Sequence, residues 1–273
     1  MLNIVSCRQK DKQPPTGHKS KTTKSIHDTI VSDTTGIPDI QRLLPVLYHQ
    51  RSGEYRALCY QSFQLARMLL MNDLHDENVI SKRAIILDVD ETVLDNSQYE
   101  AWCLLHGYDY NKEWDQWCTK AQAPALAGAV EFLNFVRRYG VDIFYITNRT
   151  EEVKQATAEN IRKAGLPLKS DEFLIMKQDD SNKESRRKQL EERYHIALLI
   201  GDNLNDFSGV FYKRSADDRI KVTDSLHSQF GSRFVVLPNV MYGDWEKALT
   251  GYQTGLSPQE EIQIKYNRLK PAN

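Results

Sequence analysis

The sequence predicts an α/β fold: a doubly wound parallel sheet covered by helices, with a small helical cap. Three observations predict it. Short apolar runs recur along the chain, as in strands that are buried on both faces. Stretches with helical periodicity separate most of these runs. Polar residues follow the runs, where ligands bind in parallel sheets. The 273 residues, 40% of them hydrophobic and 27% charged, suffice for a soluble globular protein with a sizeable core.

Charge and composition exclude several classes of protein. The formal net charge of −1 provides no basic field for a nucleic-acid polymer and no acidic tail. No apolar run approaches the roughly 18 to 20 residues that a membrane-spanning helix needs. Four cysteines are too few for a disulfide scaffold. We expect Cys59 to be a small buried hydrophobic residue, whereas Cys103 and Cys118 could pair in an oxidising compartment.

Residues 1–39 are predicted to form a polar N-terminal tail. From Arg8 to about Asp39 the chain is rich in Lys, Thr, Ser, Asp and Pro, so it cannot bury enough surface to fold and suits a tether. The segment Ile4 to Cys7 resembles a bacterial lipobox, which makes Cys7 a candidate for lipidation and favours the cell envelope. However, a signal peptide needs an apolar stretch of about 7 to 15 residues, more than precede Cys7. A periplasmic or cytoplasmic soluble protein with a disordered tail is the alternative.

The remainder, residues 40–273, is predicted to be the folded domain. Helical periodicity extends from about Ile40 to Met71, with one apolar face. Three further helices are predicted: one around Val130 to Val136, one from Val153 to Ala164, and one that starts near Lys183 and includes Leu190. The strands are predicted at five apolar runs, which are Ala84–Leu87, Val141–Ile146, Phe173–Met176, Ile196–Ile200 and Phe234–Leu237. An insert at about residues 97–123 fits neither pattern; because it is rich in aromatic residues and directly follows the first strand, we expect a cap over the site.

Two aspartates follow the first predicted strand at once. Asp88 and Asp90 are separated by one residue, so a tight turn can present both to the same small volume. Phosphoryl transfer has a use for each: one carboxylate attacks phosphorus, and the other protonates the leaving oxygen and later activates water. A cation is also needed, because an anionic nucleophile and an anionic phosphate repel each other.

Other strand ends supply the remaining groups. Asp202 offers a third carboxylate, and three oxygen donors with water and phosphate oxygens make a plausible octahedral Mg²⁺ site. Thr147 and Asn148 can bind phosphate oxygens, and Lys183 can place a positive charge against phosphate and nucleophile. Each motif alone is weak, but four in this order, each at the end of a buried strand, predict one phosphoryl-transfer site.

These motifs resemble the four motifs of the haloacid dehalogenase (HAD) superfamily, whose core is Rossmann-like. The longer segments Ile86–Ser97, Ile146–Arg149, Gly201–Phe207 and Leu237–Asn239 resemble the bacterial class C acid phosphatases, lipid-anchored enzymes that include outer-membrane 5′-nucleotidases. The resemblance covers about residues 40 to 265. It implies a Mg²⁺-dependent acid phosphatase that hydrolyses nucleoside 5′-monophosphates, and it suggests a homodimer.

The resemblance also implies roles for individual residues. Asp88 would be the nucleophile and a Mg²⁺ ligand, and Asp90 the acid/base that binds the metal through its backbone carbonyl. Asp202 would be the remaining ligand, with Asp206 in support. Thr147 and Lys183 would bind phosphate. Tyr242, and by a looser match Trp114, would hold the nucleobase by stacking, although either ring could instead be packing.

Two other functions use the same motifs. A HAD phosphotransferase would differ only in whether water or another hydroxyl group accepts the phosphoryl group. A non-enzymatic, lipid-anchored surface protein could keep the fold, but a relative of that kind would be expected to lose the nucleophile, and Asp88 is intact. A dehalogenase is disfavoured because it has no use for a second acid at Asp90.

Overall fold

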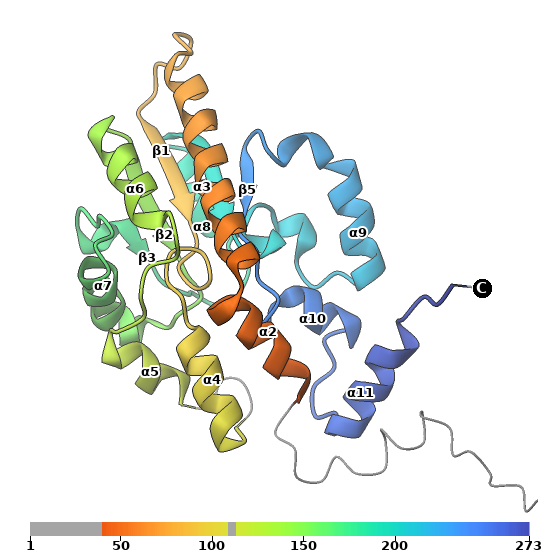
Figure 1. Cartoon of the computed structure of the whole chain (residues 1–273). Coiled ribbons are helices and arrows are strands. Elements are labelled where there is room, and N and C mark those ends of the chain that lie inside the picture. The colour runs from red at the N-terminus through yellow and green to blue at the C-terminus, as the bar shows by residue number, and fades with distance from the viewer. Residues whose placement is uncertain (1–39, 109–112, 273) are drawn as a thin grey trace, which may run out of the picture. The chain divides into compact units, whose positions relative to one another are not determined.

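Five parallel strands form the sheet at the centre of the unit that spans Pro38–Asn273 (Figure 1). The computed structural model describes residues 40–108 and 113–272, so the predicted tail, Cys7 and Tyr110 lie outside the described residues. The order across the sheet is β3-β2-β1-β4-β5. The strands are β1 (Arg83–Leu87), β2 (Asp142–Ile146), β3 (Leu174–Ile175), β4 (His195–Gly201) and β5 (Phe234–Val236).

The structure confirms the predicted α/β class and places a strand at each of the five apolar runs. The largest difference is β3, which has only two residues and pairs only with β2, through Tyr145 opposite Leu174. A 3₁₀ turn at Asp171–Phe173 takes the place of its predicted first residue.

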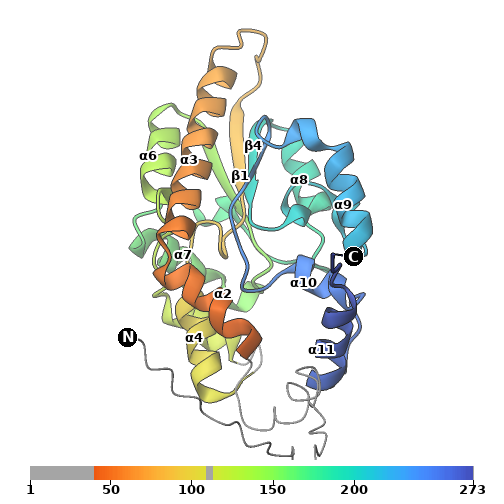
Figure 2. The same ribbon diagram turned by 45° about the vertical axis from the view of Figure 1, so that its right-hand side comes forward.

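Helices cover both faces of the sheet (Figure 2). The α-helices are α2 (Ile40–Arg51), α3 (Gly53–Leu74), α4 (Ser97–His106), α5 (Trp114–Lys120), α6 (Ala129–Arg138), α7 (Lys154–Lys163), α8 (Glu184–Glu191), α9 (Ala216–Ser225), α10 (Asp244–Leu249) and α11 (Pro258–Asn267). The 3₁₀ helices are η1 (Glu151–Val153), η2 (Asp171–Phe173), η3 (Leu204–Asp206), η4 (Gly209–Phe211) and η5 (His227–Gln229).

The helix predicted from Ile40 to Met71 is in fact two helices. Ser52 adopts an extended conformation between them, with φ −87° and ψ 137°. Its side-chain oxygen accepts the backbone N–H of Tyr55 at 3.0 Å and so caps α3. The sequence does carry a local signal of this break, because residues 49–54 contain no apolar side chain and a serine is typical of the position before a helix.

Alternating residues of β1 enter two hydrophobic clusters. Ile85 and Leu87 pack in one cluster with residues of α3 and α6, whereas Ala84 and Ile86 pack in the other with Leu190 of α8. All of these side chains are buried. A strand covered on both faces has no polar side, which is why the runs read as continuously apolar.

The course of the chain reverses at β1. From β1 it proceeds outward to β2 and β3, and it then returns to the other side of β1 to form β4 and β5. Neighbouring β1 and β4 therefore mark a topological switch point, and ligands in open α/β sheets bind beyond the carboxyl ends of such strands. Asp88 and Asp202 follow these two strands.

The insert at about residues 97–123 forms helices α4 and α5, which lie beyond the carboxyl end of β1 (Figure 1). Tyr99 packs edge-on against Trp114, with ring centroids 5.0 Å apart. Cys103 and Cys118 are buried and free, so packing rather than a disulfide holds these helices. Cys59 is fully buried in the core, as predicted. Within residues 40–108 and 113–272, no helix combines the length and apolarity that spanning a bilayer requires.

Candidate active site

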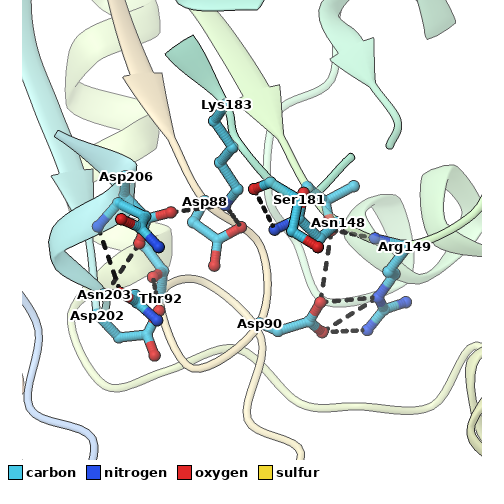
Figure 3. Close-up of polar contacts among 12 residues, drawn as sticks. Asp88, Asp90, Thr92, Asn148, Arg149, Ser181, Lys183, Asp202, Asn203 and Asp206 are labelled. Atoms are coloured by element: carbon cyan, nitrogen blue, oxygen red, sulfur yellow. Dashed lines mark hydrogen bonds and ion pairs between the residues drawn. The ribbon is translucent and has the colours of Figure 1, made fainter. Parts of the chain in front are cut away.

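Three carboxylates converge at the switch point (Figure 3). Asp88 leaves the end of β1, where its backbone N–H donates to the carbonyl of Ile200 in β4 at 3.0 Å. Asp202 follows β4 directly, and Asp206 ends the short helix η3. Each of these aspartates offers a carboxylate oxygen, and the three oxygens lie within 4.8 Å of one another.

Local backbone structure brings Asp206 this close. The N–H of Asn203 donates to Asp206 Oδ2 at 2.9 Å, which closes the capping box of η3. A Cβ atom at Gly201 would overlap the side chain of Asp206. Glycine at this position therefore gives the Asp206 side chain the space that it occupies against the end of β4.

Lys183 reaches into the cluster from the residue before α8. Its Nζ donates to Asp88 Oδ1 in a short ion pair and to Asp206 Oδ1 at 2.7 Å. Burial on its own would lower the pKa of Lys183, but Asp206 and Asp88 outweigh it and raise the pKa above its usual value. The lysine is therefore held in its charged form.

The cluster contains more negative than positive charge. Burial raises the pKa of Asp88 to about 7; Lys183 opposes that change, whereas Asp206 and Asp90 add to it. Burial, followed by Asp206 and Asp88, raises the pKa of Asp202 well above its usual value. One ammonium group cannot compensate three carboxylates.

This donor set fits a hard divalent cation. Asp88 and Asp202 each retain a carboxylate oxygen that does not contact Lys183. Oxygen ligands of this kind are those that Mg²⁺ and Ca²⁺ prefer, and a divalent ion would supply the charge that the cluster lacks. We infer that Asp88 and Asp202 would hold the metal, with Asp206 in support.

Two further side chains orient Asp202. Thr92 Oγ1 donates to Asp202 Oδ1 at 3.3 Å, and Asn239 Nδ2 donates to Oδ2 at 2.8 Å. Groups that fix a metal-binding carboxylate in this way tune its affinity for the metal. Both residues stand in motifs that the sequence analysis quoted, but their roles depend on contacts across 110 and 37 positions.

Asp90 points away from the acidic cluster (Figure 3). Its carboxylate accepts Nη2 of Arg149 at 2.7 Å and Nε at 3.1 and 3.2 Å. Asn96 Nδ2 donates to the same carboxylate at 2.9 Å. The side chain of Asp90 is therefore held by Arg149 and Asn96 and does not join the carboxylates of the acidic cluster. The family resemblance implied only its backbone carbonyl as a metal ligand. No role for Arg149 was predicted from the sequence.

Thr147 and Asn148 follow β2 on the other side of Asp88. Thr147 is fully buried, and its hydroxyl lies 3.5 Å from Asp90 Oδ2. The side-chain amide of Asn148 is engaged at both ends, because Nδ2 donates to the carbonyl of Ser181 at 3.1 Å and Oδ1 accepts from Arg186 at 2.8 Å. Arg186 thus anchors the loop beside Thr147.

The two predicted aromatic residues lie in different surroundings. Tyr242 lines a cavity of about 390 Å³ together with Asp202 and Trp245. Trp114 does not line that cavity: it packs on Tyr99, and its ring centroid lies 5.6 Å from the Arg149 guanidinium carbon. Trp245 is a further aromatic residue near Asp202 that the sequence analysis did not name as a base-binding candidate.

The fold and the site together define a class of enzyme. A buried carboxylate at the end of β1, a buried lysine that contacts it and a carboxylate set suited to a divalent cation are the components of a phosphoryl-transfer centre. The parallel sheet places all of them in the segments that follow the carboxyl ends of β1, β3 and β4.

Comparisons with known proteins give the same class. The family model for the HAD superfamily, subfamily IIIB (acid phosphatase), matches residues 18–245. The class C acid phosphatase from Bacillus anthracis superposes with a TM-score of 0.82 at 39% identity, over 85% of this chain and 98% of that chain. A second structure of that enzyme, with tungstate bound, superposes with a TM-score of 0.81 at 37% identity over the same shares.

Curated relatives are more distant. The chain is 31% identical over 147 residues to the stem 28 kDa glycoprotein of Glycine max, covering 49% of this chain and 56% of the relative. It is 30% identical over 135 residues to acid phosphatase 1 of Solanum lycopersicum, covering 45% and 51%. The chain thus spans about half the length of these curated relatives.

The chain belongs to subfamily IIIB, the acid phosphatases, of the HAD superfamily. The predicted enzyme class, a phosphomonoesterase, is thereby confirmed.

Proposed function

We propose that this protein is a Mg²⁺-dependent acid phosphatase that hydrolyses phosphomonoesters through a phosphorylated Asp88. The observation that carries the proposal is the buried cluster in which Lys183 bridges Asp88 and Asp206 while Asp202 faces them. This cluster has more negative than positive charge, so it suits a divalent cation. That cation and Lys183 can then bind a dianionic phosphate.

The residues divide the work as follows. Lys183 and Thr147 hold the phosphoryl oxygens, and an Asp88 oxygen attacks phosphorus. The bond from phosphorus to the ester oxygen breaks, and Asp90 gives that oxygen its proton. Asp90 then removes a proton from the water that hydrolyses the acyl phosphate. Mg²⁺ held by Asp88 and Asp202, with the carbonyl of Asp90, would supply positive charge against the phosphate.

Nucleoside 5′-monophosphates are the proposed substrates. Tyr242 supports this proposal because it lines the same cavity as the metal-site residue Asp202. Stacking of a base on an aromatic ring contributes about 1 to 3 kcal/mol, enough to favour a nucleotide over a simple phosphate ester. Trp114 supports it less well, since its ring packs against Tyr99 and the Arg149 guanidinium.

Purified protein tests the proposal directly. We expect hydrolysis of a panel of nucleoside monophosphates and aryl phosphates with Mg²⁺, loss of activity with a chelator, and recovery when Mg²⁺ is restored. The variant Asp88→Asn should lose at least about a thousandfold in kcat, because no nucleophile remains. More than a trace of activity in this variant would refute a covalent intermediate on Asp88. Asp171→Asn, at an exposed ion pair on η2, is the matched control.

Anchoring through a lipidated Cys7 and assembly into a homodimer remain proposals based on the family resemblance. Mass spectrometry of the protein from its native source would detect a lipid on Cys7. Sedimentation of the folded domain would determine the number of subunits.

A further inference from the structure

We propose that Arg149 is the positioning residue for acid/base catalysis: it fixes the carboxylate of Asp90 so that Oδ2 delivers the proton to the leaving oxygen. This inference rests on the proposed function, because it takes Asp90 to be the acid.

Arg149 forms an ion pair with the carboxylate of Asp90 through two of its guanidinium nitrogens. Nη2 and Nε of the guanidinium donate to Asp90 Oδ1 at 2.7 and 3.1 Å, and Nε also lies 3.2 Å from Oδ2. A planar guanidinium presents its donors in a fixed fork, which fixes both the direction and the rotation of the carboxylate.

Arg149 is itself immobilised. The residue is 2% exposed, and its Nη1 donates to Thr157 Oγ1 in α7 at 3.1 Å. The ring of Trp114 lies 5.6 Å from the guanidinium carbon. Burial would lower the pKa of Arg149, but Asp90 and the other acidic groups around it outweigh burial and raise the pKa, so the guanidinium is charged.

Asn96 adds a second constraint on the same carboxylate. Its Nδ2 donates to Asp90 Oδ1 at 2.9 Å, and its own Oδ1 accepts the indole N–H of Trp117 at 2.8 Å. The buried carboxylate of Glu91 accepts the backbone N–H of Asn96 at 2.7 Å. The amide of Asn96 is therefore fixed by both the cap and the catalytic turn.

These contacts make the two oxygens of Asp90 different. Oδ1 accepts three N–H donors, two from Arg149 and one from Asn96, which leaves no room for a proton. Oδ2 has the longer contacts, 3.2 Å to Arg149 and 3.5 Å to the hydroxyl of Thr147. Since Thr147 is a predicted phosphate ligand, Oδ2 is the oxygen that faces the substrate.

Bond cleavage and proton transfer occur together in this step. As Asp88 attacks, the bond from phosphorus to the ester oxygen breaks and its electron pair stays on that oxygen. The proton on Asp90 Oδ2 moves to the same oxygen, so a neutral alcohol leaves and Asp90 becomes a carboxylate that Arg149 stabilises. A misdirected acid matters most when the leaving group is a poor one, such as an alkoxide.

Leaving-group dependence provides the test. We would compare kcat/KM for an alkyl ester, a nucleoside 5′-monophosphate, with kcat/KM for p-nitrophenyl phosphate, whose leaving group needs no proton. This ratio reports on steps up to formation of phospho-Asp88, so the later role of Asp90 as a base does not enter. The variants are Arg149→Met, Arg149→Lys and Asp90→Asn. Arg162→Met removes an exposed arginine that also pairs with an aspartate, and serves as the matched control.

We expect Arg149→Met to lower kcat/KM for the alkyl ester by about 100-fold and for the aryl ester by less than about fivefold. Arg149→Lys keeps the charge but not the fork, so it should lose about tenfold on the alkyl ester alone. Arg162→Met should change neither ester by more than about twofold. Retained aryl activity shows that a variant is folded.

Equal losses on both esters in a folded variant would overturn the inference, since Arg149 would then be structural only. If Arg149→Met loses aryl activity too, the ratio in Arg149→Lys decides between the two outcomes. Asp90→Asn separates this inference from the proposed function. If Asp90→Asn loses as much kcat/KM on the aryl ester as on the alkyl ester, Asp90 is not the acid and the proposed mechanism fails. If Asp90→Asn loses more on the alkyl ester but the Arg149 variants do not, only the inference about Arg149 fails.

Discussion

Replacing Lys183 by Met should strongly destabilise the protein in the absence of a divalent metal. The Nζ atom of Lys183 compensates Asp88 and Asp206, and its side chain is only 5% exposed. Methionine fills a similar volume but leaves both carboxylates without a cation. Neither carboxylate can move into water, because their side chains are 10% and 5% exposed.

The expected loss follows from this burial. Breaking a buried ion pair by removing one partner costs about 3 to 5 kcal/mol, because an uncompensated charge remains in a medium of low polarity. For a chain of this size that corresponds to a fall of roughly 10 °C in Tm. The matched control is Lys188→Met in α8, the helix that Lys183 precedes, where an ammonium group that is 66% exposed pairs with Glu184 at 3.5 Å. That pair should contribute less than about 1 kcal/mol.

Unfolding in urea at pH 7, with a chelator and then with Mg²⁺, is the assay. A ligand that binds only the folded protein stabilises it by mass action. Since Lys183→Met removes a positive charge from the cluster, Mg²⁺ should stabilise this variant by more than it stabilises the wild type. In the chelator, the free energy of unfolding of Lys183→Met could instead lie within about 1 kcal/mol of that of Lys188→Met. This result would refute the excess of negative charge from which the metal site was inferred.

Three further predictions concern His49 in α2 and two residues near the metal site. Burial lowers the pKa of His49 from 6.5 to about 4, so the unfolded chain binds the proton more readily and stability falls as the pH drops from 6.5 towards 4. The variant His49→Gln can still accept the N–H of Val240. It should reduce the difference in the free energy of unfolding between pH 7 and pH 4, measured in urea, by about 3 kcal/mol. An unchanged difference would contradict a lowered pKa of His49. Asn239→Leu should weaken Mg²⁺ binding by about 10- to 100-fold in calorimetry, because Asp202 loses its 2.8 Å donor, and unaltered affinity would contradict this. Tyr242→Ala should raise KM for a nucleoside monophosphate by about tenfold but leave KM for a phosphate ester without a base unchanged; equal effects on both would exclude stacking.

The sheet was predictable because burial on two faces leaves a strong local signal. Each of the five predicted runs contains a strand, and both faces of β1 are packed. The break at Ser52 was missed because helical periodicity on either side of it favoured one helix, although residues 49–54 contain no apolar side chain. Helices α9, α10 and α11 were also missed. Arg219 is the buried residue of α9 and Ala248 that of α10, and α11 has none, so these helices carry no continuous buried apolar face.

The acidic residues of the site could be predicted from their positions at strand ends, but their partners could not. Asp88, Asp202 and Lys183 are brought together because β1 and β4 are neighbours and α8 begins beside them. Arg149 contacts Asp90 across 59 positions, and nothing local to either residue specifies the rotation of the guanidinium. Sequence patterns locate the strand ends, whereas the choice of partner depends on tertiary packing.

The separation of Asp88 from Asp90 explains how one tight turn provides two kinds of carboxylate. The two residues are only two positions apart, yet Lys183 draws Asp88 towards the acidic cluster while Arg149 draws Asp90 towards β2 and α7. The carboxylate of Asp90 is paired with Arg149, so the chain itself compensates its charge and it needs no metal for that purpose. Asp88 shares Lys183 with Asp206, so the negative charge of Asp88 is fully compensated only when a further cation binds. Pairs of acidic groups in contrasting surroundings are the usual way in which enzymes separate an acid from a nucleophile. In this protein, two basic residues from different elements produce that contrast.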